Sequence, residues 1–126
     1  MTGPPRLKIK IQIHSGEEIA MGPGKADLLD AIREHGSISA AGRAMGMSYR
    51  RAWLLVDVMN RCWDAPLVQT APGRAATSGA RVTEFGNSVL AHYRALQEGI
   101  AQVAHGPDYD ALAARLLPKP RASQKA

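Results

Sequence analysis

Three neighbouring side chains are the part of this chain best suited to binding chemistry: Tyr49, Arg50 and Arg51. They follow Ser48 within the run GSISAAGRAMGMSYRRAW, which spans residues 36–53. A guanidinium group donates several hydrogen bonds in one plane, which suits a phosphate or the edge of a guanine. The sequence leaves open which arginine would hold a base and which a phosphate. Tyr49 could either donate to a phosphate or pack at the start of a helix.

The spacing around these residues is that of two short helices joined by a tight turn. We expect the first helix over Ser39–Met45, ended by Gly46, because glycine adopts positive φ cheaply. Ser48 is placed to cap a second helix, expected over Tyr49–Cys62. This pattern predicts a helix-turn-helix, in which the first turn of the second helix reaches base edges and phosphates.

Three serines flank the two helices: Ser37, Ser39 and Ser48. Each is first of all expected to cap a helix, and each could also offer a hydroxyl or a backbone N–H to a phosphate, since a helix N-terminus favours anions. Trp53 lies one turn after Tyr49 and is expected to be a partly buried packing residue rather than a base contact.

A second DNA-contacting element is predicted further along the chain. Short strands are expected over Leu67–Gln69 and Arg81–Thr83, around the Gly/Pro/Ser/Thr-rich loop Ala71–Ala80. Two strands and a basic loop after a helix-turn-helix form a wing. Arg74 in that loop is expected to contact the minor groove or a phosphate, and Arg81 is a weaker candidate for the same role.

The elements that must position these residues lie on both sides. Alternating apolar residues from Leu7 to His14 predict a strand, paired with Glu18–Met21 in a hairpin, and a helix is expected over Lys25–Glu34. Thr83 is placed to cap a long helix over Glu84–Val103.

The long helix carries an apolar stripe that could serve as core or as a dimer seam. We favour the seam, since the helix is longer than a small three-helix domain needs. Two copies related by a two-fold axis would place their second helices about one DNA turn (~34 Å) apart and so bind an inverted repeat. The stripe consists of Val89, Tyr93, Leu96, Ile100 and Val103.

Composition narrows the class of protein. The 126 residues suffice for one domain, and 16 basic against 11 acidic residues give a net charge of +5, which favours a polyanionic partner. The single cysteine, Cys62, excludes an internal disulfide and is expected to be a small core residue in a cytoplasmic protein. No apolar run is long enough to span a membrane. The four histidines show no metal-ligand spacing and no catalytic set stands out, so we expect neither an enzyme nor a cofactor nor a metal.

These patterns divide the chain into four parts. We expect a flexible N-terminus over 1–6, a winged helix-turn-helix DNA-binding domain over 7–104, a short helix within 105–117 and a disordered basic tail over 118–126. The predicted fold class is mainly α with small β: a winged helix-turn-helix with an N-terminal β-hairpin and a long C-terminal dimerisation helix.

The run GSISAAGRAMGMSYRRAWLLVDVMN, followed by APLVQT, ARVTEFG and HYRAL, closely resembles the N-terminal DNA-binding domain of ModE-type molybdate-dependent regulators. The N-terminal hairpin and GPGKADLLDAI match as well, and LysR-type DNA-binding domains are more distantly similar. The resemblance implies a dimeric regulator that binds double-stranded DNA in molybdenum homeostasis. Members of this family continue into a molybdate-binding region that has no counterpart here. We therefore expect a stand-alone DNA-binding domain, with molybdate sensed, if at all, by a separate partner.

Two alternatives from other classes stay open. One is a winged helix that binds a protein instead of DNA. The other is a sensor that binds a small oxyanion, molybdate or tungstate, at the dimer interface.

Overall fold

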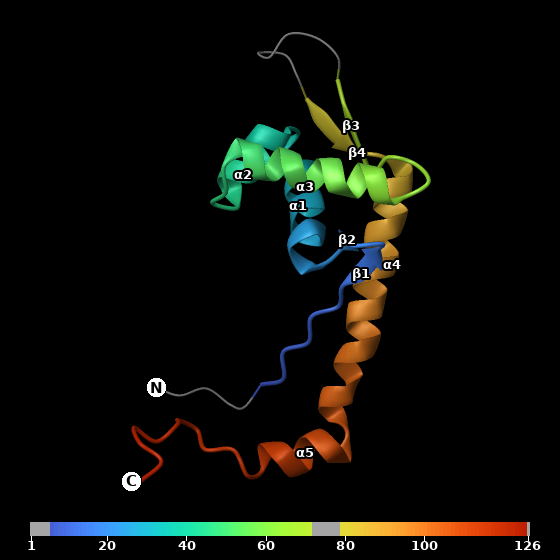
Figure 1. Cartoon of the computed structure of the whole chain (residues 1–126). Helices are drawn as coiled ribbons and strands as arrows, with labels where there is room; N and C mark the ends of the chain where they lie inside the picture. The colour runs from blue at the N-terminus through green and yellow to red at the C-terminus, as the bar shows by residue number, and fades with distance from the viewer. Residues whose placement is uncertain (1–5, 72–78, 126) are drawn as a thin grey trace. The chain divides into compact units, whose positions relative to one another are not determined.

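The computed structural model describes residues 6–71 and 79–125, which fall into two compact units. We call Lys10–Leu96 the head; the second unit contains residues 6–9 and 97–125. Figure 1 follows the elements in chain order. They are β1 (Ile13–Ser15), β2 (Glu18–Met21), α1 (Pro23–His35), α2 (Ile38–Ala44), α3 (Tyr49–Cys62), β3 (Val68–Thr70), β4 (Ala80–Val82), α4 (Glu84–Ala101), a 3-10 helix η2 (Gln102–His105) and α5 (Pro107–Ala113).

The N-terminal hairpin is shorter than its sequence predicts. β1 pairs with β2 in antiparallel fashion, and the predicted strand before Ile13 is absent: residues 6–12 adopt no regular structure. The reason lies in the partner strand, because β2 has only four residues before Gly22 and Pro23 begin α1. Among the described residues, the earlier apolar side chains thus have no strand to pair with, and Leu7 is exposed.

The core of the head forms where the helices and the two short sheets meet. It draws apolar residues from the helices α1 to α4, from the strands β2, β3 and β4, and from Leu67 just before β3. The largest fully buried side chains are Tyr93, Met21, Leu28, Leu29, Ile32, Met59, Leu67 and Val56. In α3, the buried residues are Ala52, Val56 and Met59, and Leu55 packs partly against the core.

β3 and β4 form the predicted antiparallel pair, each displaced by one residue from its expected bounds. The pair is tied to the end of α1, where the backbone N–H of Ala80 donates to the carbonyl oxygen of Gly36 at 2.9 Å. Gly36 has a φ of 76°, a left-handed conformation that glycine adopts easily, and it ends α1. The sheet therefore has a fixed position on the head.

α4 begins at the predicted residue. Thr83 caps it, accepting the backbone N–H of Gly86 at 2.9 Å. Gly86 has no room for a side chain, since a Cβ would overlap the carbonyl oxygen of Leu67 and lie 2.8 Å from a methyl group of Val82. This close approach packs the first turn of α4 against the wing strands. The helix ends at Ala101, two residues before the expected bound.

The predicted fold class is confirmed: a mainly helical winged helix-turn-helix with an N-terminal β-hairpin and a long helix after the wing. In the second unit, α5 is a short helix, and residues 114–125 form no further helix or strand. None of the helices in the described ranges is both long and apolar enough to cross a membrane.

Candidate nucleic-acid interface

α2 is capped by a different serine from the one at its expected start. The Ser37 hydroxyl accepts the backbone N–H of Ala40 at 3.0 Å, so the helix begins at Ile38. Ser39 therefore lies inside the first turn, and the expectation that it caps a helix is wrong. Its hydroxyl instead accepts a hydrogen bond from Arg43 Nη1 at 2.8 Å.

The turn between α2 and α3 is closed by paired backbone hydrogen bonds. Gly46 has a φ of 71° and donates its N–H to the carbonyl of Arg43 at 3.1 Å. Met47 donates to the carbonyl of Gly42 at 2.9 Å. This arrangement is a Schellman motif, which requires positive φ at the position that Gly46 occupies. Gly46 thus ends α2 as predicted and turns the chain toward α3.

α2 and α3 cross at unusually short range. A Cβ at Gly42 would lie 3.1 Å from the Cβ of Ala52, closer than side chains normally pack. Small residues at both positions therefore set the angle at which α3 leaves the turn. Ser48 then caps α3 as expected, its hydroxyl accepting the backbone N–H of Arg51 at 3.1 Å.

The three contact residues predicted at the start of α3 lie on its solvent side. Tyr49 is 55% exposed, and Arg50 and Arg51 are exposed beside it. None of the three has a side-chain hydrogen bond or ion pair among the contacts found in the described residues. Tyr49 therefore does not pack into the core, and two cations stand at the N-terminal end of the helix.

α3 also exposes apolar side chains. Trp53 is 42% exposed and Leu54 is 54% exposed, so the expectation that Trp53 is partly buried is wrong. Both line a shallow hollow together with Tyr49, Arg50 and Asp57. The Asp57 carboxylate accepts a hydrogen bond from Arg61 Nε at 2.9 Å, one turn further along the helix.

In the wing, Arg81 is exposed and Arg74 lies outside the described residues. Arg81 Nη2 donates to the side-chain oxygen of Gln69, its cross-strand partner, at 2.8 Å. That bond holds the guanidinium over the surface of the two strands.

Asn60 joins α3, the helix that carries the predicted DNA-contacting residues, to the wing strands. The sequence pattern does not reveal this role. Its side-chain oxygen accepts the backbone N–H groups of Leu67 and Val68, at 2.8 and 3.1 Å. Its amide nitrogen donates to the carbonyl of Val68 at 3.0 Å. The amide thus takes the place of a neighbouring strand and fixes β3 to α3.

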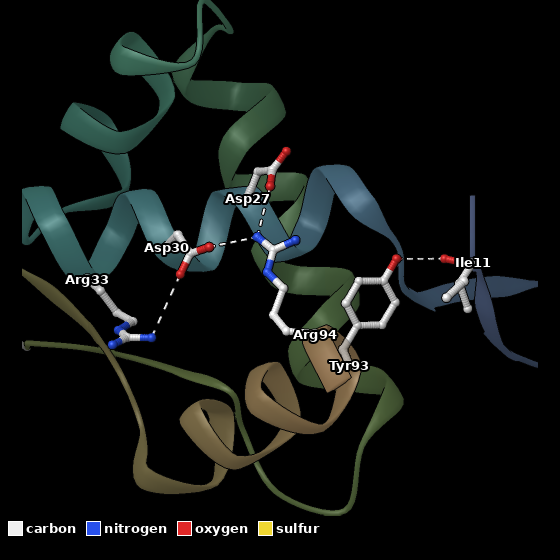
Figure 2. Close-up of polar contacts among 6 residues, drawn as sticks. All are labelled: Ile11, Asp27, Asp30, Arg33, Tyr93 and Arg94. Atoms are coloured by element: carbon white, nitrogen blue, oxygen red, sulfur yellow. Dashed lines mark hydrogen bonds and ion pairs between the residues drawn. The ribbon is translucent and has the colours of Figure 1, made fainter. Parts of the chain in front are cut away.

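Two side chains of α4, Arg94 and Tyr93, join it by three hydrogen bonds to other parts of the head (Figure 2). Arg94 Nη2 lies 2.9 Å from Asp27 and 2.7 Å from Asp30, both on α1. Burial disfavours the charged form of Arg94, but the hydrogen bonds that it donates to Asp30 and Asp27 outweigh this effect and hold its pKa above the usual value. The Tyr93 hydroxyl donates to the carbonyl of Ile11 at 2.7 Å, and burial raises its pKa.

The predicted dimer stripe divides into two parts. Val89 and Tyr93 are 9% and 1% exposed and belong to the core of the head, so their apolar surface is already packed within the chain. Leu96, Ile100 and Val103 are 48%, 36% and 56% exposed. Only these three have apolar surface left for a partner.

For a metal ion, the described ranges offer no group of three or more His, Cys, Asp or Glu side chains.

Lys25 is partly buried at the start of α1. Desolvation is the largest influence on its amine and lowers its pKa.

Known proteins resemble this chain over most of its length. No family model matches it. It is 45% identical over 83 residues to the molybdenum-pterin-binding protein MopB of Rhodobacter capsulatus. The matched residues cover 66% of this chain and 31% of MopB. It is 30% identical over 92 residues to the DNA-binding transcriptional dual regulator ModE of Escherichia coli (strain K12), covering 73% of this chain and 34% of that protein. The chain thus spans about a third of the length of these relatives.

Among solved structures, a chain from the CbnR_DBD–DNA complex superposes with a TM-score of 0.54 at 18% sequence identity. The match covers 73% of this chain and 97% of that one. At this identity the likeness concerns the fold alone, and it agrees with the winged helix described above.

Proposed function

We propose that this chain, a homologue of the ModE-type regulators, binds double-stranded DNA through the first turn of α3 and thereby controls transcription. The observation that carries the proposal is the placement of Arg50 and Arg51. They are exposed, adjacent, and stand at the N-terminal end of a helix whose direction is set by the turn at Gly46. A helix presented in this way fits the major groove.

The physical basis is electrostatic attraction combined with base contacts. Arg50 and Arg51 can each neutralise a phosphate or grip a guanine, and the first turn of α3 also offers the Tyr49 hydroxyl. The net charge of +5 adds a long-range attraction to the duplex. Arg81 and the wing loop with Arg74 would add backbone contacts beside the groove.

The experiment is a titration of labelled duplex DNA by fluorescence anisotropy at several salt concentrations. Arg50→Ala with Arg51→Ala should weaken binding at least tenfold and make it less dependent on salt, because each lost phosphate contact removes about 0.9 from the logarithmic salt slope. The matched control, Arg33→Ala with Arg115→Ala, removes the same charge elsewhere and should leave most of the affinity. Equal affinities for the two double variants would contradict the proposal.

We propose further that two copies join through the exposed part of the predicted stripe, Leu96 and Ile100 on α4 and Val103 on η2, and bind an inverted repeat. Leu96, Ile100 and Val103 supply the apolar surface. In sedimentation experiments, Leu96→Glu with Ile100→Glu should give a monomer. Leu112→Glu, which alters an exposed leucine of α5, is the control and should sediment like the unaltered chain. A monomeric unaltered chain would contradict this part of the proposal.

Two competing functions predict other outcomes. If the wing and α3 served to bind a protein, the arginine variants would keep their affinity for DNA. If the chain sensed an oxyanion directly, calorimetry with molybdate or tungstate would give saturable binding at micromolar ligand. MopB, named as a molybdenum-pterin-binding protein, is the relative that motivates the second measurement.

A further inference from the structure

The outward face of α3 is only partly basic. Ala52, Val56 and Met59 are the buried residues of this helix, and Arg50, Leu54 and Asp57 recur at intervals of three to four on its other side. Trp53 is displaced from Leu54 by one residue and borders the same hollow. The surface that would enter a groove therefore has an apolar centre.

The acidic group on this face does not weaken its attraction to a polyanion. Asp57 is engaged by Arg61 at 2.9 Å, so the two charges largely cancel. Arg50 and Arg51 then leave the surface positive at the N-terminal end of its apolar part. A partner that suits it must be anionic at its rim and must offer a small apolar group inside.

A thymine-containing major groove meets both requirements. Its phosphates line the rim, and the C5-methyl group of thymine is the one apolar group that a base presents in that groove. Leu54 follows Arg50 by one helical turn, a rise of ~6 Å, and base pairs stack every ~3.4 Å. A methyl in contact with Leu54 would thus lie within about two base pairs of the Arg50 contact.

We infer that Leu54, with Trp53 beside it, contacts thymine methyl groups and makes the chain prefer thymine at the positions they reach. This inference rests on the proposed binding of DNA and adds a source of specificity to it. Loss of contact with one methyl should weaken binding about fourfold, the effect of leaving one such group unburied.

The test begins with a duplex selected from random sequences by the unaltered chain. Each thymine is then replaced in turn by deoxyuridine, which removes only the methyl group. We expect about fourfold weaker binding at one or two thymines in each half-site. Leu54→Ala should bind the thymine duplex more weakly and should no longer distinguish the two bases there. Trp53→Ala should show the same loss at the same or a neighbouring thymine. Leu112→Ala, in α5, should behave like the unaltered chain.

The outcomes separate this inference from the proposal beneath it. If binding depends on Arg50 and Arg51 but no deoxyuridine substitution changes it, or if Leu54→Ala still discriminates, the inference is wrong and the proposed function stands. A selected site with no preferred thymine would likewise contradict the inference and leave the proposed function standing. If the chain binds no duplex, both fail. Since Leu54 is 54% exposed, its replacement leaves the core intact, and thermal unfolding of the variant should match that of the unaltered chain.

Discussion

Replacing Asn60 should loosen the wing from the contact helix. Asn60→Ala removes three hydrogen bonds at once, two accepted from the backbone of Leu67 and Val68 and one donated to Val68. Its nearest isostere, Asn60→Asp, keeps the accepting oxygen but replaces the donor with an oxygen that faces the carbonyl of Val68. The pair of variants therefore separates the accepted bonds from the donated one.

The size of the effect follows from these bonds. Each contributes about 1 kcal/mol to stability, and Asn60 is only partly buried, so water can replace part of what is lost. We expect Asn60→Ala to lower the free energy of unfolding by about 2–3 kcal/mol, which corresponds to a fall in Tm of roughly 10–20 °C. Asn60→Asp should cost about 1–2 kcal/mol, since its two accepted bonds become charge-assisted but its other oxygen is repelled by the carbonyl of Val68.

Urea unfolding followed by tryptophan fluorescence measures both values. Trp63 is a suitable reporter, because its ring nitrogen donates to the carbonyl of Ala20 and its ring meets Phe85 edge-on. A Trp53→Phe background removes the exposed second signal. An Asn60→Ala variant within about 0.5 kcal/mol of the background, or one no less stable than Asn60→Asp, would refute this account of the helix–wing junction.

Three further outcomes are expected. Gly86→Ala should lower the free energy of unfolding in urea by about 1–3 kcal/mol, because the new Cβ would overlap the Leu67 carbonyl. The control Gly99→Ala, which has open space on the same helix, should be neutral or stabilising by up to ~1 kcal/mol. Equal effects of the two substitutions would contradict the close packing at Gly86. Tyr93→Phe should cost about 1 kcal/mol by removing the bond to Ile11. Because burial raises the pKa of the Tyr93 phenol, this phenol ionises at a lower pH in the unfolded chain than in the folded one. The unaltered chain should therefore lose stability above about pH 10, and the Phe variant should lose less. Identical stability profiles at alkaline pH would contradict this expectation. Calorimetry with molybdate should show no saturable binding to this chain, since no charged side chain in its described ranges is buried; micromolar saturation would overturn that expectation.

The helix-turn-helix could be predicted from sequence because its determinants are local. The bounds of α3, the cap at Ser48 and the left-handed Gly46 all depend on a few neighbouring residues with strong conformational preferences. The start of α2 shows the limit of such reasoning. Ser37 and Ser39 are equally good caps by type, and only the position of Ile38 in the core decides between them.

Features that depend on distant partners could not be predicted. The alternation before Ile13 is that of a strand, but a strand needs a partner, and β2 is too short to provide one. Asn60 and Arg94 carry no sequence signal, since their partners lie on other elements of the fold. Likewise, the position of Trp53 next to the core stripe does not reveal that its ring stays exposed.

The central claim is that the first turn of α3 reads a DNA sequence. Selection from random duplexes, performed in parallel with the unaltered chain and with Arg50→Ala and Arg51→Ala combined, tests it most directly. We predict that the unaltered chain enriches an inverted repeat with half-sites about one DNA turn apart, and that the double variant enriches none. No enrichment by the unaltered chain, or the same enriched sequence for both proteins, would contradict the claim.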